Sequence, residues 1–206
     1  MAELNQNKID QINIQEVVHR VVHETMGTSG AHTTPKSVFT PQTESQQPAA
    51  EKQVVAIGTD HGGVDLKETL KKYLTDQGYT VIDCGTHTKD SVDYPDIALT
   101  VSEQVATRKA WRGVIIDGAG IGSCMAANKV PGIRAAMCYD YATAVNSREH
   151  NDANVLTLGA GLIGVNLAKQ IVNTWLATEF GGGRHAKRVD KIIAIEQSFI
   201  KDGKKP

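Results

Sequence analysis

The sequence predicts an α/β fold built on a parallel sheet with helices on both faces. Beyond residue 53, short apolar runs typical of buried strands alternate with segments whose apolar residues recur at helical spacing. One such run, 114–116, continues through Asp117 and a glycine-rich loop into a helix-forming segment. A strand, a glycine loop and a helix in that order form a site where backbone amides and a helix N-terminus bind an anion.

Residues 1–26 have the pattern of one short amphipathic helix. A helix this short is marginal in water, so its apolar side needs a partner. Residues 27–52 are rich in Thr, Ser, Gln and Pro, which predicts a flexible linker. The apolar positions of the helix are Ile14, Val17, Val18, Val21, Val22 and Met26.

The length of this linker bears on where the helix binds. Ordinary connections within a domain are about 4–6 residues long, so the linker favours a partner elsewhere over docking on the same domain. A short amphipathic helix on such a linker resembles the encapsulation peptides that direct enzymes into bacterial microcompartments. This resemblance implies shell or cargo proteins as partners of residues 1–26 and the microcompartment lumen as the location.

Residues 53–206 are predicted to form the globular domain. The candidate strands are 54–58, 79–84, 114–117, 133–138 and 155–158. The helical patterns between and after them are 66–74, 97–105, 123–129, 139–149, 164–178 and 184–201.

Composition narrows the class of protein. The net charge is −1 and the basic residues are scattered, so no nucleic-acid surface is expected. The three cysteines lack metal-ligand spacing, which favours core thiols in a reducing compartment. With no apolar run of membrane-spanning length and no secretion signal, we expect a cytoplasmic protein without membrane contact.

The glycine loop allows more than one interpretation. Gly118–Ser123 nearly matches the dinucleotide-binding fingerprint, and Asp140 lies near the distance expected of a ribose-binding acid. Asp117 would repel a pyrophosphate, however. A site for another small anion is therefore favoured over a dinucleotide module and over a turn with no ligand.

Four further polar groups fall at strand ends or helix starts. Each has a structural alternative: a cap, a stabilising charge at a helix end, packing, or a solvated face. Together they supply carboxylates, imidazoles, a hydroxyl and guanidiniums at the rim of the predicted cleft, which favours one functional site. They are Asp60 with His61, Tyr94, His150 with Asn151, and Arg184 with Arg188.

Residues 54 to about 197 resemble the ribose-5-phosphate isomerase B and galactose-6-phosphate isomerase family. The matching stretches are GTDHGG at 58–63, DYPD at 93–96, GAGIGSCMAANK at 118–129, GIRAA at 132–136, SREHNDANVL at 147–156 and GGRHAKRV at 182–189.

The resemblance implies a Rossmann-like, three-layer domain with a five-stranded parallel sheet. It also implies a homodimer or tetramer whose active sites are shared between subunits, with the C-terminal helix exchanged between them. The expected reaction is aldose–ketose interconversion of a sugar phosphate through a cis-enediolate, without a metal or an organic cofactor.

The resemblance also assigns roles by position. Asp60 and His61 match the first-loop pair, with Asp60 counted as catalytic, and Tyr94 matches a substrate-binding tyrosine. His150 matches the catalytic histidine that helps open the sugar ring. The other matches bind substrate: the loop amides stabilise the enediolate, Asn151 donates or accepts hydrogen bonds, and the arginines hold the phosphate. These residues are Gly118, Ala119, Gly120, Ile121, Gly122, Asn151, Arg184 and Arg188.

The chain departs from the family pattern at the base itself. Many members have a cysteine base where this chain has Asp117, and others use a glutamate where it has Ser123. The usual loop threonine is Ala119, and a further phosphate-binding arginine falls at Gly161. A carboxylate can remove a proton next to a carbonyl. We therefore expect Asp117 to be the base; the alternative is a non-catalytic sugar-phosphate-binding or structural cargo protein.

Overall fold

The computed structural model describes residues 53–201. All five strands of its sheet run parallel, in the order β2-β1-β3-β5-β4. The strands are β1 (Val54–Thr59), β2 (Thr80–Asp83), β3 (Arg112–Asp117), β4 (Ala135–Met137) and β5 (Val155–Gly159).

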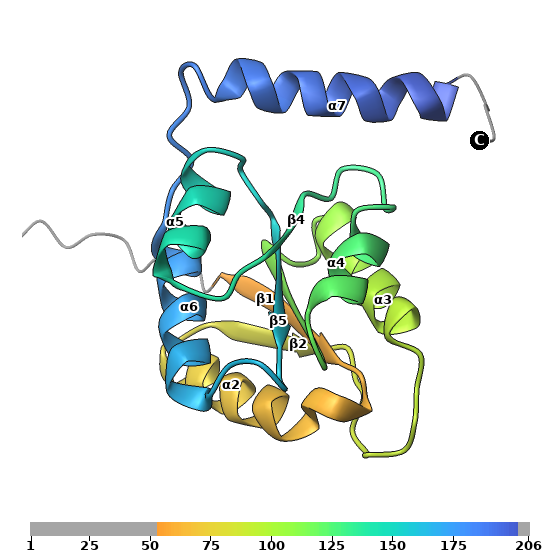
Figure 1. The fold of residues 1–206 in the computed structure, drawn as a ribbon, viewed down its shortest axis with the longest axis vertical. Coiled ribbons are helices and arrows are strands. Elements are labelled where there is room, and N and C mark those ends of the chain that lie inside the picture. Colours follow the sequence, from red (N-terminus) through yellow and green to blue (C-terminus); the bar gives the residue numbers. More distant parts are fainter. Residues whose placement is uncertain (1–52, 202–206) are drawn as a thin grey trace, which may run out of the picture. The chain divides into compact units, whose positions relative to one another are not determined.

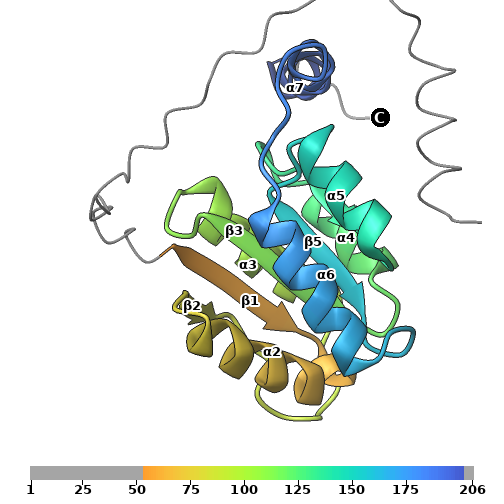
Figure 2. The same cartoon turned by 90° about the vertical axis from the view of Figure 1, so that its left-hand side faces the viewer.

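Helices cover both faces of this sheet, so the described part of the chain has three layers (Figures 1 and 2). A 3-10 turn, η2 (His61–Gly63), follows β1. The α-helices are α2 (Val64–Asp76), α3 (Tyr94–Ala106), α4 (Ile121–Ala127), α5 (Tyr141–Glu149), α6 (Val165–Ala177) and α7 (Ala186–Lys201).

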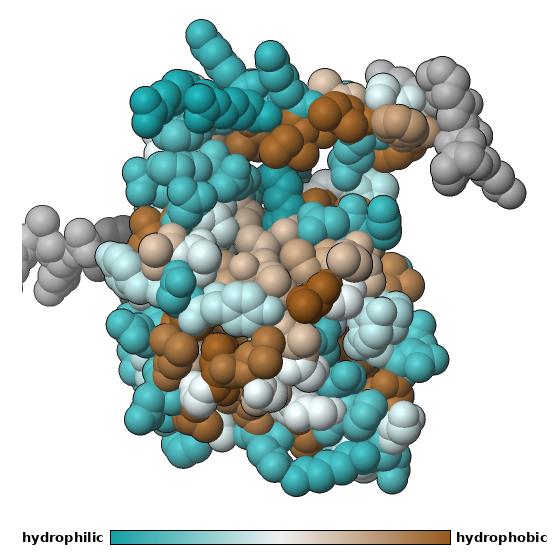
Figure 3. Space-filling model, viewed as in Figure 1, coloured by the Kyte–Doolittle hydropathy of each residue, from teal (hydrophilic) through white to brown (hydrophobic). Residues whose placement is uncertain are grey.

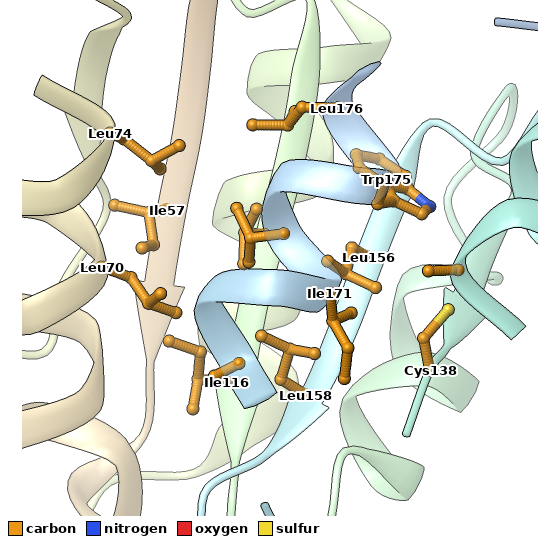
Figure 4. Close-up of a cluster of buried hydrophobic side chains, with 14 of the residues drawn as sticks. Ile57, Leu70, Leu74, Ile116, Cys138, Leu156, Leu158, Ile171, Trp175 and Leu176 are labelled. Atoms are coloured by element: carbon orange, nitrogen blue, oxygen red, sulfur yellow. The ribbon is translucent and has the colours of Figure 1, made fainter. Parts of the chain in front are cut away.

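The three central strands, β1, β3 and β5, are buried and mostly apolar because both of their faces are covered. Side chains that alternate along β1, β3 and β5 enter two separate clusters. The larger cluster packs against α2, α5 and α6 around the fully buried Trp175 (Figure 4). The smaller one packs against α3 and α4. The carboxyl ends of the strands therefore emerge from a closely packed base.

Buried polar contacts at the amino edge of the sheet fix the chain that leads into α7. The Arg112 guanidinium, at the start of β3, donates to the carbonyls of Trp175 and Leu176 at 2.7 and 2.9 Å, and to that of Thr178 at 3.3 Å. The Gly181 amide donates to the Glu149 carbonyl at 2.9 Å. The beginning of α7 and the end of α5 thus lie together at this edge (Figure 1).

These elements confirm the predicted fold class, the five strands and the six helices, with shifts of one or two residues at most boundaries. The helix after the glycine loop begins at Ile121 instead of residue 123, because Gly120 turns the chain in the left-handed region at φ 80°. The predicted helix at 1–26 and linker at 27–52 lie outside the described residues. No helix among those described has the length and apolar content that a bilayer span requires.

Candidate functional site

The loops after β1 and β3 lie side by side at the carboxyl edge of the sheet. Thr59 pairs with Ile116 in register, and the Asp60 amide donates to the Ile116 carbonyl at 3.2 Å. Asp60 is buried and its Oδ1 accepts the Gly62 amide at 2.9 Å, so it caps η2. A Cβ added at Gly62 would lie 3.9 Å from the Gly118 nitrogen, which places the first loop against the glycine loop.

His61 and Tyr94 complete the exposed part of this edge. The His61 ring is exposed, and its Nδ1 accepts the Val92 amide at 3.4 Å, which leaves Nε2 to carry the proton in the neutral ring. Tyr94 begins α3 and is 41% exposed. Its ring covers Gly122 so closely that an added Cβ there would lie 2.6 Å from it, so a side chain at this position would displace the ring.

Asp117 is bound into the glycine loop that it precedes. The carboxylate is buried, 4% exposed, and faces the backbone amides of the loop. Oδ1 accepts the Ala119 amide at 2.8 Å and also the Gly120 amide, and Oδ2 accepts the Ser123 amide at 3.0 Å. The loop conformation therefore depends on this side chain.

The same contacts set the acidity of Asp117. Burial alone would raise the pKa of this carboxyl, but the hydrogen bonds from Ser123, Gly120 and Ala119 outweigh burial and lower its pKa below the ordinary value. The sequence left the balance between burial and the helix N-terminus open, and the structure resolves it toward the ionised form. Asp117 is thus a stable anion and a weak base.

Each carbonyl of residues 118–120 accepts a hydrogen bond from another part of the domain. Gly118 O accepts the Gly161 amide at 3.0 Å, Ala119 O accepts the Tyr139 hydroxyl at 2.9 Å, and Gly120 O accepts Thr157 Oγ1 at 2.8 Å. Tyr139 and Thr157 were not predicted from the sequence. They are one strand or more away along the chain, and no local motif identifies them.

These bonds determine which loop amides a ligand can reach. Within residues 53–201, the amides of Gly118, Ile121 and Gly122 donate to no protein acceptor, whereas those of residues 119, 120 and 123 bind Asp117. Fixed, unoccupied N–H groups next to Tyr94 and Asp60 can stabilise negative charge on a ligand oxygen without reorganising.

A second cluster of predicted site residues lies at the amino edge of the sheet. His150 ends α5, and its ring stacks on His185 with centroids 4.1 Å apart and planes 5° apart. Burial first, then His150 and the arginines at 184 and 188, lower the pKa of His185. Asn146, for which the sequence gives no signal, contacts His150 Nδ1 at 2.8 Å.

The two clusters are on opposite edges of the sheet, which corrects the expectation that one cleft rim unites them. In a parallel α/β unit a helix runs back from the carboxyl edge to the amino edge, so α5 carries His150 away from the glycine loop. The six residues of β3 separate the edges by about 20 Å at ~3.3 Å per residue. No single chain brings Asp117 and His150 to one substrate.

Two alternative ligand types find little support in the described residues. Glu68, Asp83 and His87 are close enough to share a cation, but Lys67 and Lys71 each lie 2.7 Å from Asp83 and neutralise it. The ribose-binding acid expected of a dinucleotide site, Asp140, instead caps α5 through Thr143.

Of the three thiols predicted to be core residues, that of Cys138 is buried, whereas those of Cys84 and Cys124 are half-buried. Cys138 is fully buried, and Cys124 Sγ faces the Ala135 carbonyl at 3.5 Å instead of the glycine loop. Burial raises the pKa of each thiol, to about 11 for Cys84. None of them replaces the cysteine base that the family pattern places at 117.

A doubly covered parallel sheet, with free amides and ionisable groups at its carboxyl edge, defines the α/β proteins that bind a small anionic ligand at strand ends. The particular family follows from sequence comparison: residues 55–192 match the family described as Ribose/Galactose Isomerase. The chain belongs to this family, and it is an isomerase of the aldose–ketose type.

Curated relatives are similar over nearly their whole length. Ribose-5-phosphate isomerase B of Escherichia coli K12 is 45% identical over 143 residues, which is 69% of this chain and 96% of the relative. The D-erythrulose-4-phosphate isomerase of Pectobacterium atrosepticum is 45% identical over 139 residues, 67% of this chain and 91% of the relative. The family match begins at residue 55 and so leaves out the N-terminal quarter of the chain.

A solved structure has the same fold. Ribose-5-phosphate isomerase B of Clostridium thermocellum superposes with a TM-score of 0.71 at 53% identity, covering 71% of this chain and 99% of that one. The Mycoplasma genitalium enzyme with bound ribulose-5-phosphate superposes with a TM-score of 0.68 at 38% identity, covering 70% and 96%.

Proposed function

We propose that this protein interconverts an aldose phosphate and a ketose phosphate through a cis-enediolate, with ribose 5-phosphate and ribulose 5-phosphate as the first candidates. The observation that carries the proposal is the set of free amides of Gly118, Ile121 and Gly122 beside Tyr94. An enediolate develops negative charge on an oxygen, and such amides stabilise that charge. This chemistry requires neither a metal nor an organic cofactor.

Oδ2 of Asp117 is the proposed base. Oδ1 accepts two amides, whereas Oδ2 accepts one backbone amide and keeps a lone pair for a proton from carbon. The low basicity of this carboxylate is the cost of the arrangement. The free amides stabilise the enediolate and so make the carbon-bound proton more acidic, which offsets the low basicity of Asp117. Proton transfer depends on the difference between the pKa of this carbon acid and that of the Asp117 carboxyl.

The active site is proposed to form between two chains. One chain contributes Asp60, His61, Tyr94 and the glycine loop, and the second contributes its amino-edge cluster. In that cluster His150 acts in ring opening, Asn151 binds the sugar, and Arg184 and Arg188 hold the phosphate. A homodimer or a tetramer then supplies the active unit.

The C-terminal helix gives independent support for a second copy. Four large apolar side chains of α7, Ile192, Ile195, Phe199 and Ile200, are 47–64% exposed. They line a groove of about 740 Å³ between α7 and the segment that leads into β4 (Figure 3). The occupant we propose is the same helix region of a second copy, because a two-fold contact there joins surfaces continuous with the amino-edge cluster.

The experiment is an isomerase assay on tetrose, pentose and hexose phosphates, in the presence and absence of a chelator. We expect turnover of ribose 5-phosphate that the chelator does not change. The D-erythrulose-4-phosphate isomerase relative makes tetrose phosphates the second substrate class to assay. Saturable binding of a sugar phosphate without turnover of any would favour the non-catalytic binding or cargo protein instead.

We also propose that residues 1–26 direct the protein from the cytoplasm into a microcompartment, where shell or cargo proteins bind them. The apolar stripe and the long polar linker of the sequence support this. Fusion of residues 1–50 to a fluorescent protein should give puncta in a compartment-forming host. Diffuse fluorescence there would contradict the proposal.

A further inference from the structure

The last turn of α5 carries an amide side chain between two proposed substrate-binding residues. Asn146 Nδ2 lies 2.8 Å from Nδ1 of His150, four residues further along the helix. The Asn146 side-chain oxygen accepts Nδ2 of Asn151 at 3.4 Å, and its backbone carbonyl accepts the same group at 3.3 Å. One exposed asparagine thus contacts both of its neighbours in the cluster.

These contacts determine the orientation of the Asn146 side-chain amide. Its oxygen faces the N–H donor of Asn151, so its NH2 group faces His150. A donor at that position requires a lone pair on Nδ1. The neutral His150 ring then carries its hydrogen on Nε2.

The remaining groups around His150 act on other parts of the ring. Glu149 Oε1 lies 3.8 Å from Nε2, which favours a hydrogen there. The face of the ring stacks on His185, whose Nε2 accepts a hydrogen bond from the Arg184 guanidinium at 3.4 Å. The positive charges of Arg184 and Arg188 act on His185. Among residues 53–201, Asn146 is the only side chain within hydrogen-bond distance of Nδ1.

We propose that Asn146 is a positioning residue that holds His150 in the Nε2–H tautomer, so that this ring acts as a hydrogen-bond donor in sugar-ring opening. The inference rests on the proposed function and assigns His150 a definite role within it. A neutral imidazole used as a donor is a known solution in isomerases, as in the handling of the carbonyl by triosephosphate isomerase.

The ring-opening step balances without a change in the charge of His150. The O1–H bond of the cyclic pentose breaks, and its electron pair forms the C1=O1 double bond. The C1–O4 bond breaks and leaves its pair on O4. Water transfers the proton from O1 to O4, while the Nε2–H group donates a hydrogen bond to O4 as negative charge develops there.

Two substitutions separate this role from a structural one. Asn146→Leu removes the amide at similar size, and Asn146→Asp replaces the donor with an acceptor and favours a hydrogen on Nδ1. Asn173→Leu, at another exposed asparagine on a helix, is the matched control. The readouts are kcat/KM on two sugars and the ring-nitrogen chemical shifts of His150, assigned with His150→Gln.

The two sugars differ in whether a ring must open. Ribose 5-phosphate closes a ring through O4, whereas a tetrose 4-phosphate has O4 esterified and cannot. We expect both Asn146 variants to lose about 10- to 100-fold in kcat/KM on ribose 5-phosphate, which corresponds to loss of one oriented donor. Their loss on a tetrose 4-phosphate should stay below about twofold.

The nitrogen shifts decide the tautomer whether or not either sugar is turned over, so failure of the proposed function leaves this test intact. We expect a protonated Nε2 and an unprotonated Nδ1 in the wild type, with the preference reversed in Asn146→Asp. A protonated Nδ1 in the neutral wild-type ring, unchanged turnover in both variants, or equal losses on the two sugars would overturn the proposal.

Discussion

Substitution of Asp117 by asparagine separates the two roles that the structure gives this side chain. As the proposed base, Asp117 takes a proton from the substrate carbon. As the acceptor of three backbone amides, it also shapes the glycine loop. Asparagine is nearly isosteric, has no charge at neutral pH, and keeps only one acceptor oxygen.

The structure gives the size of each effect. If the oxygen of the introduced amide takes the Oδ1 position, its NH2 group opposes the Ser123 amide; in the other orientation it opposes two amides. Hydrogen bonds to a charged group contribute about 1.5–3 kcal/mol each, so we expect the free energy of unfolding to fall by about 2–4 kcal/mol. Loss of a general base lowers kcat by a further 10²–10⁴-fold or so.

The assay pairs kcat with thermal unfolding for Asp117→Asn, Asp117→Cys and the exposed control Asp65→Asn. Cysteine restores a base at the same position, so we expect partial recovery of turnover in Asp117→Cys, with a rate that increases toward the ordinary thiol pKa of about 8.5. A folded Asp117→Asn protein with more than about a tenth of wild-type kcat would refute the base assignment.

Three further perturbations test the phosphate grip, the loop and the ion pairs. Arg184→Ala and Arg188→Ala should each raise KM for a sugar phosphate by about 10- to 100-fold in steady-state assays, with little effect on kcat. An unchanged KM would contradict a role of these arginines in binding the phosphate. Thr157→Val removes the bond to the Gly120 carbonyl and should lower kcat about tenfold at unchanged KM, whereas full activity would show that this bond does not position the amides. Hydrogen bonds from Lys67 and Lys71 outweigh burial and lower the pKa of the Asp83 carboxyl to about 2. The ionised carboxylate therefore stabilises the fold fully above pH about 4, the ordinary aspartate pKa, and this stabilisation is lost as the pH falls from about 4 toward 2. Asp83→Asn leaves the fully buried Lys67 with the exposed Glu68 carboxylate, at 3.1 Å, as its remaining ionic partner, and should cost about 1–3 kcal/mol at neutral pH in denaturant unfolding. Asp76→Asn, in an exposed pair, should cost less than about 1 kcal/mol; equal small losses would refute this account.

The sheet could be predicted from sequence because its signals are local. Apolar runs such as 114–116 lie between polar segments with helical spacing, and burial on both faces of a parallel sheet produces that pattern. The boundary at Ile121 was missed by two residues, since the turn depends on the backbone angle of Gly120. That angle is not visible in the residue types alone.

The arrangement of the predicted site residues differs in part from the one expected. Asp60, Tyr94 and the glycine loop carry local signals and lie together as expected. His150 was expected at the same rim, but α5 returns to the opposite edge, and this separation is a property of topology. Tyr139 and Thr157 contribute through single bonds to loop carbonyls across the sheet, for which no sequence spacing gives a signal.

The direction of the Asp117 pKa shift could also not be predicted from the sequence alone. A helix N-terminus lowers the pKa of a carboxyl and burial raises it, and the sequence shows both influences without their sizes. Hydrogen bonds from the Ser123 side chain and from three backbone amides outweigh burial and lower the pKa of Asp117. Asn146 was missed for a related reason, because an exposed polar residue on a helix has no distinguishing pattern until its neighbours are placed.

The central claim is that two chains complete one active site, and mixing inactive variants tests it most directly. Asp60→Ala together with Asp117→Asn disables the carboxyl-edge half, and His150→Ala together with Arg188→Ala disables the amino-edge half. After subunit exchange in a one-to-one mixture, half of the dimers are mixed and each contains one intact site. The account predicts recovery of about a quarter of wild-type turnover; a mixture that forms mixed dimers and stays as inactive as its components would contradict it.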